Sequence, residues 1–259
     1  MPETSMKSVL TIAGSDPTGG AGLQADLKVF RAFGVHGLSV PAALTAQNTT
    51  GVESVLPVAK DLFLKQLDVL LDDILPDAMK TGMLYSPWVV ETVAERIRER
   101  SLRNLVVDPV TVSSSGMGLV ENGALDRIRE LLFPHSRVIT PNIYEASVLA
   151  GTNIENEGDM ERAAVMLKAM GPEVVVVTGG HLEEVTIDLY YDGRDFHRME
   201  SPKLRGEYHG TGCAFSAAIA ASLAGGDSPL NAVRKAKDFV TEAIRRAYHP
   251  GKGMGILNI

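Results

Sequence analysis

The chain has 259 residues, 45% of them apolar, which is enough for one large α/β core spanning residues 1–259. Its formal net charge is −7 and its Lys and Arg residues form no run, so nucleic acid and anionic membranes are disfavoured as main partners. The single cysteine, Cys213, excludes an intrachain disulfide and fits a reducing cytoplasm. No run of about 18 apolar residues predicts a membrane span, and the apolar run 9–13 is too short for a signal peptide.

Short β-branched runs that end in Gly, Pro, Asp or Asn predict the strands. They cover residues 9–13, 38–43, 105–107, 138–140, 174–178 and 187–191. Segments with helical periodicity lie between most of them, at residues 22–33, 61–71, 87–100, 124–132, 160–170, 213–224 and 229–248. This alternation predicts an α/β fold of three layers, with a mostly parallel central sheet and helices on both faces. The turn at residues 190–194, Tyr-Tyr-Asp-Gly-Arg, predicts a hairpin and one antiparallel stretch near an edge.

A glycine-rich turn at residues 13–22 follows the first predicted strand and leads into a helix that carries Asp26. Residues 20–25 match the dinucleotide fingerprint G-x-G-x-x-A, which keeps a nicotinamide oxidoreductase among the alternatives. The second strand ends at Gln47, however, where that fingerprint requires an acidic ribose ligand. No Walker A sequence is present, because the only Gly-Lys pair, residues 251–252, is followed by glycine, so a P-loop kinase is disfavoured.

The sequence His-Gly-Thr-Gly-Cys at residues 209–213 opens a helix of small residues. A Gly-x-Gly turn at a helix N-terminus exposes several backbone N–H groups, and together with the helix dipole they form an anion-binding site. In a phosphoryl transfer such a site would stabilise the charge on the moving phosphate. The structural alternative is a capped, buried helix in which Cys213 only fills space.

Three polar residues follow other predicted strands. Asp108 follows one strand, and Asn142 and Glu145 follow the next. Their oxygen atoms are suitable ligands for Mg²⁺, although each residue type is also common in turns and helix caps. A further strand ends at Thr178 and continues into glycines, including Gly180, which would suit a position beside a nucleotide.

Taken together and in order, these motifs resemble hydroxymethylpyrimidine/phosphomethylpyrimidine kinase, the kinase of thiamine biosynthesis in the ribokinase-like superfamily. The resemblance rests on residues 13–28, 46–49, 80–84, 108–110, 140–146, 179–181 and 209–213, and it covers nearly the whole chain. It implies two successive ATP-dependent phosphorylations, of 4-amino-5-hydroxymethyl-2-methylpyrimidine and then of its monophosphate. It also implies a homodimer.

The resemblance assigns roles to individual positions. The residues expected around the pyrimidine are Gly14, Asp26, Gln47, Met83 and Val110. The residues expected to serve Mg²⁺ and the ATP phosphates are Asp108, Asn142 and Glu145, and the anion hole would consist of Gly210, Gly212 and Cys213. Thr211 is expected beside the nucleotide. The Gln47 amide suits a 4-aminopyrimidine because it can complement a donor beside an acceptor. Lys237 could reach the nucleotide, or it could be a solvated helix lysine.

Cys213 is expected to have a lowered pKa at the helix N-terminus, which would make it a candidate base. A thiol that can stay neutral would also tolerate the phosphorylated substrate of a second step, which a carboxylate would repel. One departure from the family pattern is Ser114, where Lys is usual, so a phosphate or lid contact could be missing. The alternatives are a pyridoxal kinase and a non-catalytic pyrimidine-binding regulator on the same fold.

Overall fold

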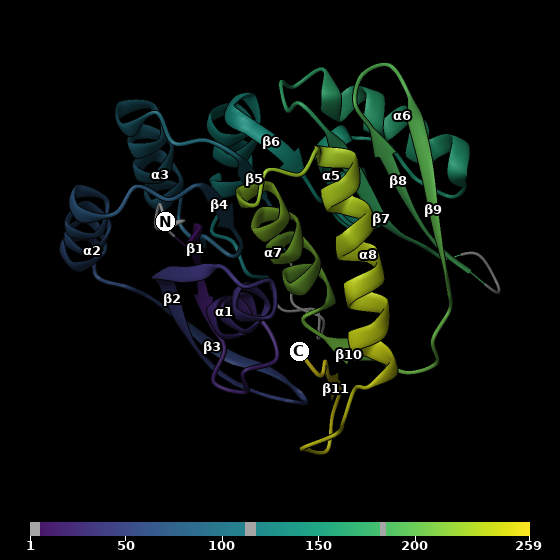
Figure 1. Cartoon of the computed structure of the whole chain (residues 1–259), viewed down its shortest axis with the longest axis horizontal. Coiled ribbons are helices and arrows are strands. Elements are labelled where there is room, and N and C mark those ends of the chain that lie inside the picture. The colour runs from purple at the N-terminus through teal and green to yellow at the C-terminus, as the bar shows by residue number, and fades with distance from the viewer. Residues whose placement is uncertain (1–5, 112–117, 182–184) are drawn as a thin grey trace, which may run out of the picture.

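The computed structural model describes residues 6–111, 118–181 and 185–259. A sheet of nine strands runs through the described chain in the order β3-β2-β1-β4-β5-β6-β7-β8-β9 (Figure 1). Strands β2, β1, β4, β5, β6 and β7 are parallel, and β3, β8 and β9 pair in the antiparallel sense. The predicted α/β class and mostly parallel sheet are therefore confirmed, as is the antiparallel hairpin at one edge.

The strands have the following bounds: β1 Ser8–Ser15, β2 His36–Asn48, β3 Gly51–Pro57, β4 Ala78–Thr81, β5 Leu105–Val107, β6 Ser136–Ile139, β7 Val175–His181, β8 Val185–Tyr191, β9 Phe196–Pro202, β10 Tyr208–His209 and β11 Gly255–Ile256. Strands β10 and β11 form a separate small parallel pair. The sequence patterns missed β3, β4, β9, β10 and β11. They are short or carry polar residues, so they lack the apolar β-branched run on which the prediction relied.

The helices are α1 Gly22–Ala32, α2 Lys60–Asp73, α3 Pro87–Arg100, α4 Ala124–Arg127, α5 Ile143–Ala150, α6 Glu157–Lys168, α7 Thr211–Ala224 and α8 Pro229–Arg245. A π-helical turn, Ile128–Leu132, continues α4, so the predicted helix over 124–132 changes its hydrogen-bonding pattern halfway. The prediction missed α5, which follows β6 after only a short turn.

Side chains that alternate along the strands build two cores, one on each face of the sheet. On β1, Val9 packs with α1, α7 and α8, whereas Leu10 packs with α2, α3, α5 and α6. Strand β5 repeats this alternation with Val106 and Val107. Figure 1 shows α7 lying over one face of the sheet, with α1 on one side of it and α8 on the other. Because both faces are covered, the central strands carry apolar residues on both sides.

The sheet order reverses next to β1, which lies between β2 and β4. In open α/β sheets, ligands bind beyond the carboxyl ends of the strands at such a switch point. The fold therefore predicts a site where β1 and β4 end, close to the N-terminus of α7. Among the described residues, no helix is both long and apolar enough to cross a membrane.

Candidate active site

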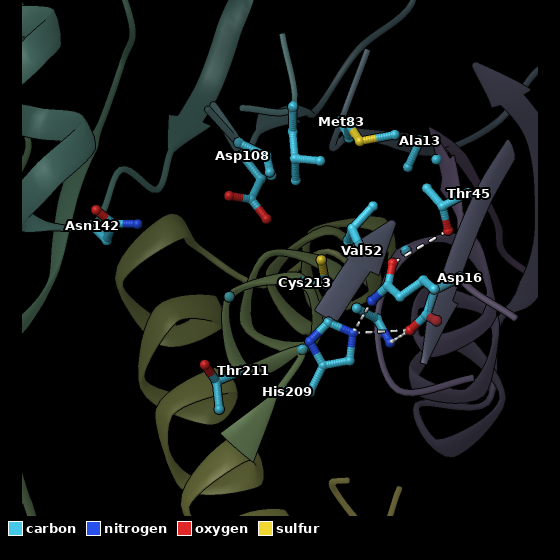
Figure 2. A pocket seen from close by; sticks show the side chains of 18 of the residues that line it. Ala13, Asp16, Thr45, Val52, Met83, Asp108, Asn142, His209, Thr211 and Cys213 are labelled. Carbon is cyan, nitrogen blue, oxygen red and sulfur yellow. Dashed lines mark hydrogen bonds and ion pairs between the residues drawn. The ribbon is translucent and has the colours of Figure 1, made fainter. Parts of the chain in front are cut away.

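A cavity of about 210 Å³ lies at this switch point. It collects most of the residues that the sequence analysis singled out, namely Gly14, Gln47, Met83, Asp108, Val110, Asn142, Glu145, Thr178, Gly210, Thr211, Gly212 and Cys213. Figure 2 shows Thr45 and Asp16 on one side of the cavity, Asn142 on the other, and Cys213 between them. Residues as far apart in the chain as Ala13 and Cys213 thus line one space.

One wall of the cavity is apolar. Met83 and Val110 contribute to it as predicted, and Val52 and Leu119 extend it. The backbone at Gly14 passes so close to Met83 that a Cβ at this position would collide with the Met83 side chain. A methionine side chain pressed against bare backbone adapts well to the face of a flat ring.

The Gln47 side chain lies between two neighbours. Its amide oxygen is placed 3.2 Å from Thr45 Oγ1, and its amide nitrogen is placed 2.7 Å from His209 Nε2. The pairing of β2 with β3 shifts register between Ala46 and Gln47, and such bulges re-aim side chains beside functional sites. His209 Nε2 is also 3.0 Å from Asp16 Oδ2 (Figure 2).

The N-terminus of α7 points its first amides into the cavity. Its first hydrogen bond runs from Ala214 N to Gly210 O, so the N–H groups of residues 211–213 have no partner within the helix. Gly210 has a φ of 83°, and a Cβ there would collide with the carbonyl oxygen of Gly20. Only glycine at this position lets the two glycine-rich loops meet backbone to backbone, which places the anion hole next to the first loop.

Asp108 and Glu145 are buried carboxyl groups that line the same cavity as this helix end. Asp108 Oδ2 accepts a hydrogen bond of 3.0 Å from Ser216 Oγ, one turn into α7. Glu145 forms a capping box with Asn142 at the start of α5, in which each side chain accepts from the other residue's backbone N–H. Burial and the nearby Asp108 carboxylate raise the pKa of Glu145 to about 8. When both groups are ionised they repel each other. A divalent cation between them would remove this repulsion, so the pair is suited to bind one.

The pKa of Cys213 differs from the prediction. Burial raises the pKa of its thiol to about 12, and Asp108 and Asp26 add to the effect while Lys80 opposes it. The expected lowering by the helix N-terminus is therefore wrong for the free protein, because desolvation and two carboxylates outweigh the helix dipole. At neutral pH the thiol is protonated and uncharged.

Asp26 lies outside the lining of the cavity, contrary to its predicted place beside the ring. Its side chain is fully buried under the first loop and accepts hydrogen bonds from Thr11 Oγ1 at 2.6 Å and from Lys80 Nζ at 2.9 Å. The carboxylate is therefore already saturated by partners in the core. Asp26 acts on the site through Lys80, whose charge is felt by Cys213 and Asp108.

Lys237 also lies outside the cavity lining, and the surroundings of Gly180 are not described. Lys237 is buried and donates to Asp188 Oδ2 at 2.8 Å, so its interpretation as a solvated helix lysine is wrong. Asp188 Oδ1 accepts from the backbone N–H of Gly179, so this ion pair supports β7 at the register shift next to Thr178. Ser114 lies outside the described residues.

The sequence analysis did not single out Asp16, Thr45, Lys80 or His209 as site residues. His209 directly precedes the Gly-x-Gly turn, and Asp16 follows the end of β1, so both stand beside motifs that were recognised. Their position next to a glycine-rich turn was the sequence signal that could have marked these two residues as part of the site. It could not show which side chains meet across the cavity.

A mostly parallel sheet with helices on both faces, a helix N-terminus aimed into a cavity, and two buried carboxyl groups beside it define a class of protein. They are typical of small-molecule kinases that use ATP without a P-loop. The comparisons with known proteins agree. The family model described as phosphomethylpyrimidine kinase matches residues 16–258, so the chain belongs to the phosphomethylpyrimidine kinase family and is a phosphotransferase of the ribokinase-like fold.

Three relatives illustrate the range of similarity. The chain is 41% identical to the hydroxymethylpyrimidine/phosphomethylpyrimidine kinase of Bacillus subtilis, over 98% of this chain and 95% of that protein. It is 45% identical to the thiamine biosynthesis bifunctional protein ThiED of Geobacter sulfurreducens, over 97% of this chain, and it spans about half (52%) of that protein's length. The structure of the Staphylococcus aureus pyridoxal kinase in complex with AMP-PCP superposes with a TM-score of 0.91 at 35% identity, covering 98% of this chain and 93% of that one. The family expected from the sequence motifs is confirmed.

Proposed function

We propose that this chain transfers the γ-phosphoryl group of ATP to 4-amino-5-hydroxymethyl-2-methylpyrimidine and then to the resulting monophosphate, giving the diphosphate for thiamine biosynthesis. One observation carries the proposal. The α7 amides, the two buried carboxyl groups and the Gln47 amide all face a single cavity. That cavity is therefore equipped to hold a flat polar ring at one end and a phosphoryl group at the other.

At the ring end, Gln47 would hydrogen-bond the aminopyrimidine edge while Met83 and Val110 contact the ring face. At the other end, the N–H groups of residues 211–213 would stabilise charge that develops on the transferred phosphoryl group. Phosphoryl transfer demands mainly positioning and charge stabilisation, so a strong base is not needed. The neutral thiol of Cys213 is compatible with both steps, because it repels neither the alcohol substrate nor the phosphorylated one.

The carboxyl groups fit Mg²⁺. Asp108 and Glu145 are hard oxygen donors, and the buried hydroxyl of Thr140 beside them lacks a hydrogen-bond partner in the described part of the chain. Among the described residues, no group of three or more His, Cys, Asp or Glu side chains is placed to hold a metal ion by itself. Asp108 and Glu145 would hold the ion, directly or through water, and Asn142 and Thr178 would lie beside the nucleotide. The ion would supply positive charge to the phosphate oxygens.

A pyridoxal kinase is the second candidate, favoured by the superposition on the Staphylococcus aureus enzyme. The Gln47 amide argues for the pyrimidine, because a ring nitrogen beside an exocyclic amine presents an acceptor next to a donor, whereas the ring nitrogen of pyridoxal is flanked by a methyl-bearing carbon and a C–H group. We also propose that residues 1–259 act as one kinase domain in the cytoplasm and assemble as a homodimer. Sedimentation analysis of the purified chain would test the dimer.

The decisive experiment incubates the chain with the pyrimidine alcohol and Mg-ATP and counts the phosphates on the product by mass spectrometry. We expect a monophosphate that is converted to a diphosphate. A parallel comparison of kcat/KM for pyridoxal should favour the pyrimidine. Binding of the pyrimidine without any ATP turnover would instead indicate the non-catalytic regulator.

A further inference from the structure

The Gln47 amide lies between two side chains. The other hydrogen bonds of these side chains decide whether each presents a donor or an acceptor to the amide. Thr45 Oγ1 is at one end of the amide and His209 Nε2 is at the other. An amide oxygen and an amide nitrogen have nearly the same shape, so the orientation of a Gln side chain is decided by its partners. The protons on Thr45 and His209 therefore determine which end of Gln47 is which.

The first partner, His209, must carry a proton on Nε2. This atom lies 3.0 Å from Asp16 Oδ2, which also accepts from Thr18 Oγ1 and from the backbone N–H of Ala21, each at 2.8 Å. Burial alone would raise the pKa of Asp16, but the hydrogen bonds from His209 and Thr18 hold it below its usual value, so the group is an ionised, accept-only carboxylate. A bare nitrogen facing this carboxylate would be repelled.

The other ring nitrogen of His209 supports the same assignment. Nδ1 is buried and has no hydrogen-bond partner among the described residues. A buried N–H without a partner is rarer in proteins than a buried acceptor without one. In a neutral imidazole the single proton therefore belongs on Nε2, and a protonated Nε2 has no lone pair with which to accept from an amide nitrogen.

The second partner, Thr45, has already used its hydroxyl proton. Thr45 Oγ1 donates to the backbone carbonyl oxygen of Ser15 at 2.8 Å, a shorter contact than the 3.2 Å to Gln47. One hydroxyl has one hydrogen, so it turns a lone pair toward Gln47. Thr45 thus requires the amide nitrogen at its end, and His209 requires the amide oxygen at the other.

We propose that His209, together with Thr45, locks the Gln47 amide with its oxygen toward His209 and its nitrogen toward Thr45, and that this lock determines ring specificity. The inference rests on the proposed function, since it concerns recognition at the same site. His209 is a positioning residue. Its single Nε2–H lies between Asp16 Oδ2 at 3.0 Å and the Gln47 amide at 2.7 Å, so one shared, three-centre hydrogen bond orients both the ring and the amide oxygen. One lone pair and one N–H of Gln47 then remain for the ligand in a fixed order.

An amide with a fixed donor and a fixed acceptor can pair with a ring that presents an acceptor and a donor in the matching order, but not with a ring in which the two are exchanged. In a 4-aminopyrimidine, the exocyclic amine donates and the neighbouring ring nitrogen accepts. The amine would face the His209 end and the ring nitrogen the Thr45 end. In the 4-oxo analogue, the carbonyl accepts and the ring N–H donates, so both hydrogen bonds are reversed. An amide free to rotate would accept either ring, whereas a locked one cannot.

The test measures dissociation constants of the 4-amino and 4-oxo hydroxymethylpyrimidines without ATP, and kcat/KM for both with Mg-ATP. The wild type should prefer the amino ring by about a hundredfold or more, because the wrong ring leaves buried polar groups unpaired. His209→Leu should reduce this preference to about tenfold or less by releasing the amide. His209→Gln should restore it, because a Gln amide N–H can replace Nε2–H toward both Asp16 and Gln47.

A purely structural role for His209 would weaken binding of both rings equally, so an unchanged preference in a folded His209→Leu protein would overturn the inference. If that variant does not fold, Thr45→Val removes the other half of the lock and decides the question by the same ratio. An imidazole ¹⁵N spectrum of the wild type gives an independent readout, in which a proton on Nδ1 and not on Nε2 would also overturn it. A wild type that phosphorylates neither pyrimidine would instead contradict the proposed function.

Discussion

Asp26 and Lys80 form an ion pair in which neither side chain reaches solvent, with Lys80 Nζ 2.9 Å from Asp26 Oδ2. The pair joins α1 to β4 directly behind the site, and the Lys80 charge acts on both Cys213 and Asp108. The pair therefore affects the pKa values of two groups that line the cavity. Its consequences can be measured separately from substrate binding.

Asp26→Asn should destabilise the protein by about 3–5 kcal/mol, because it leaves the Lys80 ammonium buried without a counterion. Urea unfolding at pH 7 measures this loss. The double variant Asp26→Asn/Lys80→Met should be clearly more stable than the single one. The exposed pair Lys7–Asp77 gives the control, where Asp77→Asn should cost less than about 1 kcal/mol. Equal losses of unfolding free energy at the two sites would show that burial does not increase the contribution of the ion pair to stability.

Gly210→Ala should cost both stability and activity. Its positive φ strains any side chain, and the added Cβ would also collide with the Gly20 carbonyl oxygen. Gly226 separates the two effects, since its φ is 94° but a Cβ there meets nothing within 4 Å. We expect Gly226→Ala to cost about 1–2 kcal/mol, and Gly210→Ala at least about 1 kcal/mol more.

Displacement of the α7 amides by Gly210→Ala should also lower kcat by about a hundredfold, whereas Gly226→Ala should leave kcat unchanged. Thermal unfolding and steady-state assays on the same preparations provide both readouts. A Gly210→Ala enzyme with normal kcat would mean that the backbone contact between the two loops does not position the anion hole.

Cys213→Asp should keep the first phosphorylation and selectively lose the second. The natural thiol is neutral, with a pKa of about 12. A carboxylate in its place would repel the monophosphate substrate by about 4 kcal/mol at 4 Å and an effective dielectric of 20, which is up to about a thousandfold in rate. Separate assays of the alcohol and the monophosphate measure the two steps. Cys213→Ser, which adds no charge, should preserve their ratio, and equal loss of both rates in Cys213→Asp would refute the charge argument.

Glu145 should make the protein less stable as the pH rises. Its pKa is about 8 in the folded state, well above that of an unfolded-chain carboxyl, so the native state holds a proton that the unfolded state has released. Stability from this group is complete below the unfolded pKa and is lost as the pH rises toward 8, by up to about 1.4 kcal/mol per pH unit. Glu145→Gln should flatten the dependence between pH 6 and 8.

The capping box of α6 supplies the matched control for Glu145. Asp159 occupies the same position in that box, but the backbone N–H of Glu155 holds the pKa of its carboxyl below the usual value. Asp159→Asn should therefore leave the slope between pH 6 and 8 as in the wild type. Urea unfolding free energies at several pH values measure all three proteins. A wild-type slope in Glu145→Gln would assign the effect to another group.

Local sequence predicted the parts of this fold that depend on neighbouring residues. The helix over Pro87–Arg100 has the predicted bounds, and the β-branched run Leu105–Val107 is a strand. Helical periodicity and burial on both faces of a strand produce patterns of apolar residues within about ten positions, so the sequence alone shows them. Strand β4 was missed because Ala-Met-Lys-Thr contains a lysine, and its burial depends on Asp26 54 positions earlier.

The alternation of strand and helix patterns predicted the α/β class, and the ordered motifs indicated the family and most of the residues that line the cavity. Tertiary structure decided what those residues do to one another. It turned Asp26 toward Lys80 and away from the cavity, raised the pKa of Cys213 against the helix dipole, and brought His209 to Gln47 across 162 positions. The physical reason is that turn chemistry and periodicity are local, whereas desolvation and the choice of a charge or hydrogen-bond partner depend on which distant segments pack together.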